Sequence, residues 1–428
     1  MEIKTLLKSN LKSHRGTVFG VFVLILLVSL SLGTVLTVAF NSGRYVNSEM
    51  DRLGYGDITA WVSGISDVAP LAEEISALDE VDSVGVQPLI FSEYEIDAQE
   101  SDSEGQLITY EPEHYPYKFF ADDLSGYKDA PEEIAQGEIY APASMASMFG
   151  VQIGDLITFP IARSGGDMTF TVAGFFEDPF MGSSMIGMKG FLINGKDHEE
   201  IAGMIREAGA DNLAREGFML HISQSPGSEL NSAGFNAFLN ENTSLQSYVE
   251  FTHSHEAISG FMLTLQNVFT SLLLAFVVIL LLASMAVLSH SIGSTIEQDY
   301  VNMGILKTMG FTGGKLRKVQ LLQYLITTLC CMTAGVLFSI PVSDFICRMT
   351  VTTTGLLIPA ALPVGICLAA LAVILLLLLG FVWFCTGKIS RISPVSAVRG
   401  TLKETQTSKR AAFPVRKKGL SFWLALHW

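Results

Sequence analysis

Charged residues are scarce in this sequence. Only 16% of its 428 residues are Asp, Glu, Lys or Arg, whereas soluble proteins typically carry ~25%. Hydrophobic residues make up 49% of the chain. This composition excludes a wholly soluble protein.

Basic residues are almost missing from the middle of the chain. Residues 41–256 hold 9 Lys or Arg against 37 Asp or Glu, a net charge of −28, whereas the rest holds 18 against 5, a net charge of +13. The total of −15 is therefore the sum of two opposite regions. The positive charges lie in short stretches beside apolar segments, which argues against nucleic acid as a partner.

Cysteine is absent from this acidic region, and cofactor-binding motifs are absent throughout. The five cysteines all lie in or beside apolar segments of the last third, which suggests neither a disulfide framework nor a zinc site. The glycines before Lys315 lack the spacing of a phosphate-binding loop, and no G-x-S-x-G, H-E-x-x-H or C-x-x-C occurs. We expect no nucleotide site, no catalytic residues, no cofactor and no enzymatic activity in this chain.

Two local patterns raise the question of a metal. His253 and His255 stand on one side of an extended segment, but a third ligand is missing, so solvated junction residues are the better interpretation. Six acidic residues fall within 97–113, yet their spacing matches no calcium-binding loop. We expect no metal site, and we expect 97–113 to be a mobile loop because large apolar residues are few there.

Four uncharged segments are long enough to cross the hydrocarbon layer, which needs ~20 residues. They predict transmembrane spans at residues 17–40, 257–290, 319–343 and 364–387. A cleaved signal peptide is the alternative for the first, but its apolar core would have only ~7–15 residues. Residues 257–296 contain no proline and predict one continuous helix of ~60 Å, part of which forms a stalk at the Ala257 end.

The basic residues indicate an orientation. Four precede the first span, four lie within 297–318 and nine follow the last span. Because Lys and Arg favour the cytoplasmic side, we expect both termini inside the cell, with the domain 41–256 and the loop 344–363 outside. Asp344 and Arg348 either pair or remain two solvated charges.

The outward domain shows one pattern twice. A strand, a helix and a strand are predicted at 56–63, 67–78 and 84–96, and again at 217–223, 229–239 and 245–251. These two β-α-β units can fold into one α/β module. Between them, residues 121–200 predict a β-rich lobe. The predicted fold class is an α-helical bundle of four spans, with a large extracytoplasmic α/β domain inserted between spans 1 and 2.

The connection 291–318 contains an amphipathic pattern. Its polar residues are Glu297, Asp299, Asn302 and Lys307, and its apolar residues are Met303, Ile305, Leu306 and Met309. Gly310 follows. The pattern predicts a short helix that ends at glycine. Such a helix either binds a partner or lies on the lipid surface.

This connection resembles a segment of the FtsX/MacB-like ABC transporter permeases. TIEQDYVNMGILKTMG at 295–310 is similar to their E-I-G-I-L-K-A-L-G segment, and RISPVSAVR at 391–399 to their I-S-P-V-E-A-L-R ending. GEIYAP at 137–142, FGVQIGD at 149–155 and FTVAG at 170–174 resemble their outward domain. LLKSNLK at 6–12 resembles an amphipathic helix before span 1, expected here at residues 1–16. The motifs occur in the order of the family.

The resemblance implies a permease subunit in the cell membrane of a bacterium, with a separate cytoplasmic ATPase as partner. It also implies a second permease copy and contact with membrane lipids. Residues carried over as the ATPase-coupling surface are Met303, Gly304, Ile305, Leu306, Lys307 and Gly310. The implied function is export or extrusion of an amphiphilic lipid, lipoprotein, peptide or drug. The alternatives are a subunit that activates an envelope partner without transport, and a membrane-anchored sensor without an ATPase.

The basic tail, residues 388–428, leaves two alternatives open. RKKGLSFWLALHW at 416–428 resembles the helix before span 1, so it can begin a second copy of the four-span unit. It can equally be a helix that rests on the inner membrane face, because Trp, Lys and Arg favour that interface.

Overall fold

The computed structural model describes residues 15–390, apart from 97–98, 102 and 164. Its contacts divide the chain into two compact units. The sheet unit comprises Ile25–Leu281 and Cys331–Ala372. The helical unit comprises Leu282–Cys330 together with the described residues up to Leu24 and from Val373 onward. The predicted helix at residues 1–16 falls almost wholly outside the described residues, as do the motif 391–399 and most of the tail.

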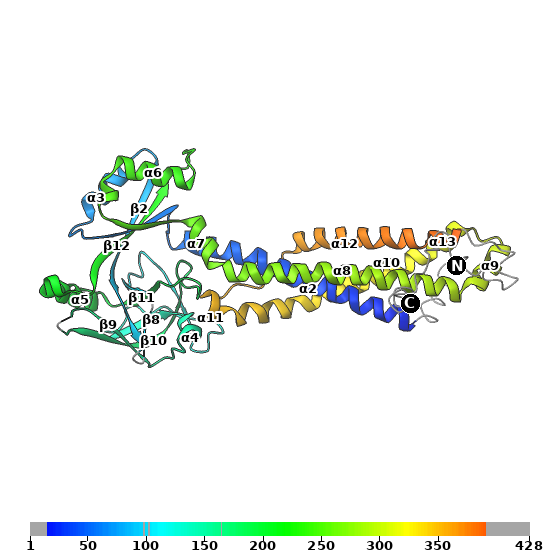
Figure 1. The fold of residues 1–428 in the computed structure, drawn as a ribbon, viewed down its shortest axis with the longest axis horizontal. Helices are drawn as coiled ribbons and strands as arrows, with labels where there is room; N and C mark the ends of the chain where they lie inside the picture. The colour runs from blue at the N-terminus through cyan, green and yellow to red at the C-terminus, as the bar shows by residue number, and fades with distance from the viewer. Residues whose placement is uncertain (1–14, 97–98, 102, 164, 391–428) are drawn as a thin grey trace, which may run out of the picture. The chain divides into compact units, whose positions relative to one another are not determined.

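Among the described residues, four helices are long and apolar enough to cross a membrane. They are α2 (Arg15–Arg52), α8 (Thr264–Gln298), α10 (Gly313–Met349) and α12 (Val364–Cys385), drawn from blue to orange in Figure 1. Helices suit these segments because a bilayer core contains no water, so the backbone N–H and C=O groups must form hydrogen bonds with each other. With the α/β sheet domain between the first two, they confirm the predicted fold class.

The predicted continuous helix over 257–296 is wrong at one residue. Helix α7 (His255–Met262) ends at Leu263, whose ψ is 1°, and α8 begins at the next residue. Met262 and Leu263 are both buried in the apolar core of the sheet unit. The break in the helix therefore falls at buried, packed residues, where no proline marks it.

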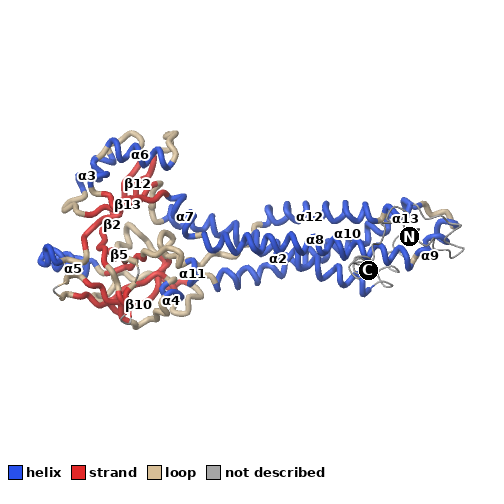
Figure 2. The backbone as a smooth tube through the Cα atoms, in the orientation of Figure 1, coloured by secondary structure: helices blue, strands red, loops and turns tan. Residues whose placement is uncertain are grey.

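Within the described residues, thirteen strands form one sheet, drawn in red in Figure 2. The strands are β1 (Ile58–Ser63), β2 (Val81–Ser92), β3 (Glu95–Ile96), β4 (Gln99–Glu100), β5 (Gly105–Thr109), β6 (Lys118–Phe120), β7 (Tyr127–Lys128), β8 (Glu138–Pro142), β9 (Leu156–Pro160), β10 (Asp167–Glu177), β11 (Lys189–Ile193), β12 (Arg215–Gln224) and β13 (Val249–Ser254). The main path runs β13-β1-β12-β2-β5-β11-β8-β10-β9-β3-β4, and β6 pairs with β10 and β7.

The two predicted β-α-β units do form one module. Antiparallel β1 lies between β13 and β12, and β2 pairs with the other edge of β12. Helices α3 (Ala69–Ser76) and α6 (Ser232–Asn242) lie beside these strands (Figure 2). Ile75 from α3 and Phe235 from α6 are fully buried in the same core as Leu220 of β12.

The mobile loop predicted at 97–113 is wrong. Strand β5 occupies its centre and pairs with β2 on one side and β11 on the other. Leu107 and Ile108 are buried. The acids at both ends of the segment concealed this short apolar strand. The β-rich region of the sheet therefore includes β5 as well as the strands between 121 and 200.

One apolar core includes both the sheet and the ends of the long helices. It contains Leu53, which follows α2, Met262 of α7 and Cys347 of α10. Leu356 and Ile358, from the connection between α10 and α12, are almost fully buried in it. The sheet and this connection are therefore packed as one body.

Other helices complete the fold. They are α4 (Met145–Met148), α5 (Gly195–Ala208), α9 (Tyr300–Thr308), α11 (Val351–Thr354) and α13 (Gly387–Ser390), with 3-10 turns η1 (Gly209–Asp211) and η2 (Ser244–Ser247). Asn194 caps α5, since its side chain accepts the N–H of Lys196 at 2.7 Å.

Candidate functional site

Helix α9 is the short helix predicted in the connection between α8 and α10. Its C-terminal turn closes on Gly310, whose φ of +94° suits glycine. The Phe311 N–H bonds the Leu306 carbonyl at 3.0 Å, and the Gly310 N–H bonds the Lys307 carbonyl at 3.2 Å. Glycine therefore ends the helix by taking a backbone conformation that other residues avoid.

One face of α9 is packed within the helical unit. Met303 and Gly304 are buried. Lys307 turns toward α13, and its ammonium donates to the Ile389 carbonyl at 3.0 Å. Burial lowers the pKa of Lys307. Three of the six predicted coupling residues thus lie on the packed face or contact the protein itself.

The opposite face of α9 is exposed and apolar. Val301 is 45% exposed, Ile305 44% and Met309 72%. These residues are four positions apart, so they form one stripe along the helix and its last turn. We call Val301, Ile305 and Met309 the α9 stripe. Of the predicted coupling residues, only Ile305 belongs to it, whereas Leu306 is half-buried at its side.

In the sheet unit, a buried carboxylate joins three distant segments. Glu177, at the end of β10, is 1% exposed. It accepts the Tyr45 hydroxyl of α2 at 2.8 Å, the Tyr127 hydroxyl of β7, and the backbone N–H of Leu357 at 2.9 Å. We call Tyr45, Tyr127, Glu177 and the Leu357 amide, together with Lys118 and Glu49, the junction cluster.

Positive charge compensates this carboxylate and a second one. The Lys118 ammonium lies 3.8 Å from Glu177 and 2.6 Å from Glu49 of α2. Arg52 donates to the other oxygen of Glu49 at 2.8 Å. Burial raises the pKa of Glu177, while the bonds from Tyr127, Leu357 and Tyr45 and the charge of Lys118 oppose that rise. The cluster has paired charges, which buried ions require.

A loop from the sheet holds the connection between α10 and α12. The Ser184 N–H bonds the Thr353 carbonyl at 2.8 Å. Gly355 has a φ of +73°, and a Cβ there would lie 2.4 Å from the Gly182 carbonyl oxygen. Only glycine fits this approach.

A buried lysine organises that loop from inside. The Lys189 ammonium donates to the carbonyls of Met181, Ser183 and Ile186. Burial lowers the pKa of Lys189 to about 8, against the favourable charge of Asp178. The carboxylate of Asp178 accepts the N–H groups of Phe180 and Met181 at 2.9 and 3.0 Å. The loop that contacts Thr353 and Gly355 is therefore fixed at both ends.

Helices α2 and α10 approach closely through glycine. A Cβ on Gly335 of α10 would lie 2.7 Å from the Leu26 carbonyl oxygen and from Cβ of Ser29. On the other helix, a Cβ at Gly33 would lie 2.6 Å from Oγ of Ser339. Small residues permit such contact between apolar helices.

The other residues singled out in the sequence have structural surroundings. The His253 ring lies among Trp61, Phe251 and Phe261, and His255 Nε2 is 3.3 Å from the Asn47 side-chain oxygen. In the part of the chain that the structure describes, no three His, Cys, Asp or Glu residues are grouped as metal ligands. Of the two alternatives for Asp344 and Arg348, the structure has the pair, at 2.9 Å.

The junction cluster was not predicted from the sequence. Glu177 and Lys118 are two charged residues among many in an acidic region, with no motif around them. A signal existed in the connection itself, where Leu356, Leu357 and Ile358 are consecutive apolar residues. Exposed loops rarely contain three consecutive large apolar residues, so this run indicated that the connection is buried.

Comparison with known proteins places the C-terminal part of the chain. Residues 274–394 match the family described as FtsX-like permease C-terminal. Over these residues, the resemblance to FtsX-like permeases is confirmed. A search of curated proteins found no match.

Two solved structures are similar to about half of the chain. The periplasmic region of MacB from Actinobacillus actinomycetemcomitans is 13% identical, with a TM-score of 0.25, over 50% of this chain and 95% of that one. The extracellular domain of the noncanonic ABC-type transporter YknZ from Gram-positive bacteria is 10% identical, with a TM-score of 0.23, over 46% and 98%.

Proposed function

We propose that this chain is the permease subunit of an ABC transporter and couples ATP hydrolysis by a separate cytoplasmic ATPase to movement of its outward domain. The α9 stripe carries the proposal. Three exposed apolar residues on one helix face form a surface that a protein partner can cover. The packed face, with Met303 and Gly304 buried, anchors the helix within its unit.

The shared core supports transmission of movement. Leu53, Met262 and Leu356 pack together with the sheet, so displacement of these helix ends displaces the sheet. The junction cluster strengthens the same connection, because Glu177 bonds both α2 and the Leu357 amide. A closely packed interface transmits movement because its side chains cannot rearrange to absorb it.

The coupling surface we propose differs from the six residues carried over by resemblance. Ile305 remains central, with Val301 and Met309 beside it. The packed face of α9, with Met303, Gly304 and Lys307, holds the helix against its own unit. Leu306 lies at the side of the stripe, and Gly310 ends the helix. Removal of these residues would weaken the surface indirectly.

Stimulation of a co-expressed ATPase subunit tests this proposal. Ile305→Asp places a charge in the stripe, and we expect it to abolish both co-purification and stimulation of ATP hydrolysis. Thr312→Asp adds the same charge at an exposed residue whose hydroxyl caps the next helix, so it is the matched control. Equal ATPase stimulation by the two variants would refute coupling through the stripe.

For the cargo, we propose export or extrusion of an amphiphile such as a lipid, lipoprotein, peptide or drug. The long helices hold few charges that an ion pathway would need. The alternative is a subunit that activates an envelope partner. Photo-crosslinking of the full chain in native membranes separates the two, since a hydrophobic small molecule supports export and a hydrolase supports activation.

We also propose the assembly and the location that accompany this function. The chain would act with a second permease copy, identical or different, in the cell membrane of a bacterium, with both termini in the cytoplasm. Cysteine labelling at Lys315 and at Ser228, with a reagent that does not cross membranes, tests the orientation. Labelling of Ser228→Cys alone in intact cells is expected.

A further inference from the structure

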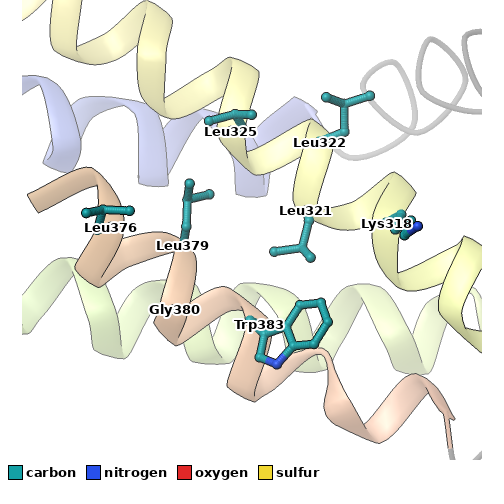
Figure 3. A pocket seen from close by; sticks show the side chains of 8 residues that line it. All are labelled: Lys318, Leu321, Leu322, Leu325, Leu376, Leu379, Gly380 and Trp383. Atoms are coloured by element: carbon teal, nitrogen blue, oxygen red, sulfur yellow. The ribbon is translucent and has the colours of Figure 1, made fainter. Parts of the chain in front are cut away.

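Helices α10 and α12 line an open, shallow groove within the helical unit. Its volume is about 550 Å³. Leu321 and Leu325 of α10 face Leu376 and Leu379 of α12 across it (Figure 3). These helices are long and apolar enough to span the membrane, so the groove is open to hydrocarbon chains rather than to water.

Gly380 makes room in the wall of the groove. A Cβ at this position would meet nothing within 4 Å, in contrast to Gly335 on the packed side of α10. The glycine therefore serves no close approach between helices. It leaves space that a ligand can occupy.

One end of the groove carries positive charge. Lys318 lines this end beside Trp383, and its side chain is exposed (Figure 3). Among the described residues, Lys318 has no hydrogen-bond or ion-pair partner. Arg317, by contrast, stacks on the Trp383 ring at 3.5 Å and donates to the hydroxyl of Thr386 at 3.3 Å. Arg317 thus fixes the indole, while Lys318 stays available.

The combination selects an amphiphile with negative charge. An apolar groove that ends at an ammonium complements an acyl chain that ends at a phosphate, and basic residues at the end of membrane helices attract anionic headgroups. Tryptophan favours the same headgroup level. We propose that this groove binds one acyl chain of an anionic phospholipid of the surrounding bilayer, with its phosphate on Lys318.

A lipid phosphate supplies the negative charge that Lys318 lacks among the described residues. The ligand is a component of the membrane and is distinct from the cargo proposed above.

Native mass spectrometry of the full-length protein tests this site. The delipidated protein would be mixed with phosphatidylglycerol or with phosphatidylcholine of the same acyl chains. We expect at least a fivefold preference for phosphatidylglycerol. Lys318→Gln should remove the preference, whereas Lys315→Gln, at an exposed lysine outside the groove, should retain it. Equal retention of both lipids by the unmodified protein would overturn the proposal.

A groove-filling variant tests where the chain lies. Gly380→Leu should reduce retained phosphatidylglycerol at least fivefold, because its side chain enters open space. Gly365→Leu is the control, since a Cβ there also meets nothing within 4 Å but the residue lies outside the groove. Identical lipid counts for the two variants would contradict the proposal. Loss of a dimer mass in Gly380→Leu, without loss of lipid, would assign the groove to a second copy instead.

Discussion

The sheet unit and the helical unit treat the same residue type in opposite ways. In the sheet unit, Gly335 of α10 lies against the backbone of α2, where a Cβ would come within 2.7 Å of Leu26. In the helical unit, Gly380 of α12 has nothing within 4 Å of the same added atom. One glycine closes an interface, and the other leaves a surface open.

The contrast extends to charged and apolar side chains. The sheet unit surrounds Glu177 with three hydrogen-bond donors and pairs Lys118 with Glu49. The helical unit leaves the α9 stripe uncovered and Lys318 without a described partner. Under the proposed function, the paired groups of the junction cluster transmit movement, and the uncovered groups of the helical unit bind other molecules. Substitutions in the sheet unit should therefore change stability, whereas substitutions at the open surfaces of the helical unit should change binding.

The largest effect is expected where the glycine is packed. Gly335→Leu would force α2 and α10 apart, because the nearest atoms belong to backbone and to Ser29 Cβ. Overpacking costs about 1–3 kcal/mol or more, and here backbone must move, so we expect loss of most folded protein. The measurement is the yield of monodisperse protein and its thermal midpoint. Gly365→Leu should match the unmodified chain, and equal loss in both would contradict this account.

The next effect is expected in the junction cluster. Glu177→Leu leaves the Leu357 N–H without its acceptor, and it leaves the Tyr45 and Tyr127 hydroxyls, 2.8 Å apart, with only each other as acceptors. Each unsatisfied buried group costs about 1–3 kcal/mol. Glu177→Gln keeps an acceptor oxygen and should cost less. Hydrogen exchange in a peptide spanning 351–360 measures the effect, with faster exchange in Leu than in Gln. Unchanged exchange in both variants would show that the connection is held without Glu177.

A smaller, pH-dependent effect is expected at His221. Its ring is fully buried against Tyr55, Tyr115 and Phe180. Burial lowers the pKa of His221 from 6.5 to about 3. Above pH 6.5 the histidine is neutral in both states. As the pH falls from 6.5 toward 3, the unfolded chain takes up a proton that the folded chain refuses, so stability falls by roughly 1.4 kcal/mol per pH unit.

The His221→Gln variant isolates this contribution from other titrating groups. Urea unfolding midpoints at pH 7 and pH 5 should differ less in the variant than in the unmodified chain. His198, whose pKa burial lowers to about 4, acts in the same direction and is unchanged in both proteins. An identical pH response would mean that His221 does not titrate as its burial implies.

The smallest effect on stability is expected in the α9 stripe. Met309→Ala removes a side chain that is 72% exposed. The shift of the thermal midpoint should therefore correspond to a change of less than about 0.5 kcal/mol in the free energy of unfolding. Met303→Ala removes a buried side chain of the same helix and should cost about 2 kcal/mol. If the stripe is the docking surface, Met309→Ala should reduce ATPase stimulation more than Met303→Ala does. A destabilised Met309→Ala would show that the stripe is already covered.

The sequence predicts those features that depend on neighbours in the chain. Uncharged runs predicted the four long helices, and the alternation of strands and helices predicted the elements of the two β-α-β units. Gly310 predicted the end of α9. Each of these signals lies within about 40 residues, and each is confirmed by the structure.

The remaining features depend on residues far apart in the chain. Tyr45 and Glu177 are 132 positions apart, and Glu177 and Leu357 are 180 apart, so no local pattern connects them. The break at Leu263 arises from tertiary packing of Met262. Strand β5 was missed because it has only five residues and lies between acidic residues. The face that α9 presents also required the structure, because periodicity shows two faces but not which one is packed.

The burial of Leu356 and Ile358 has a consequence for how the protein is made. The strands lie between residues 58 and 254, but these two apolar residues are synthesised about a hundred residues later, after α10. The core that receives them stays incomplete until that part of the chain has emerged. During synthesis, the sheet unit therefore cannot finish folding until α10 and the connection that follows it have been made.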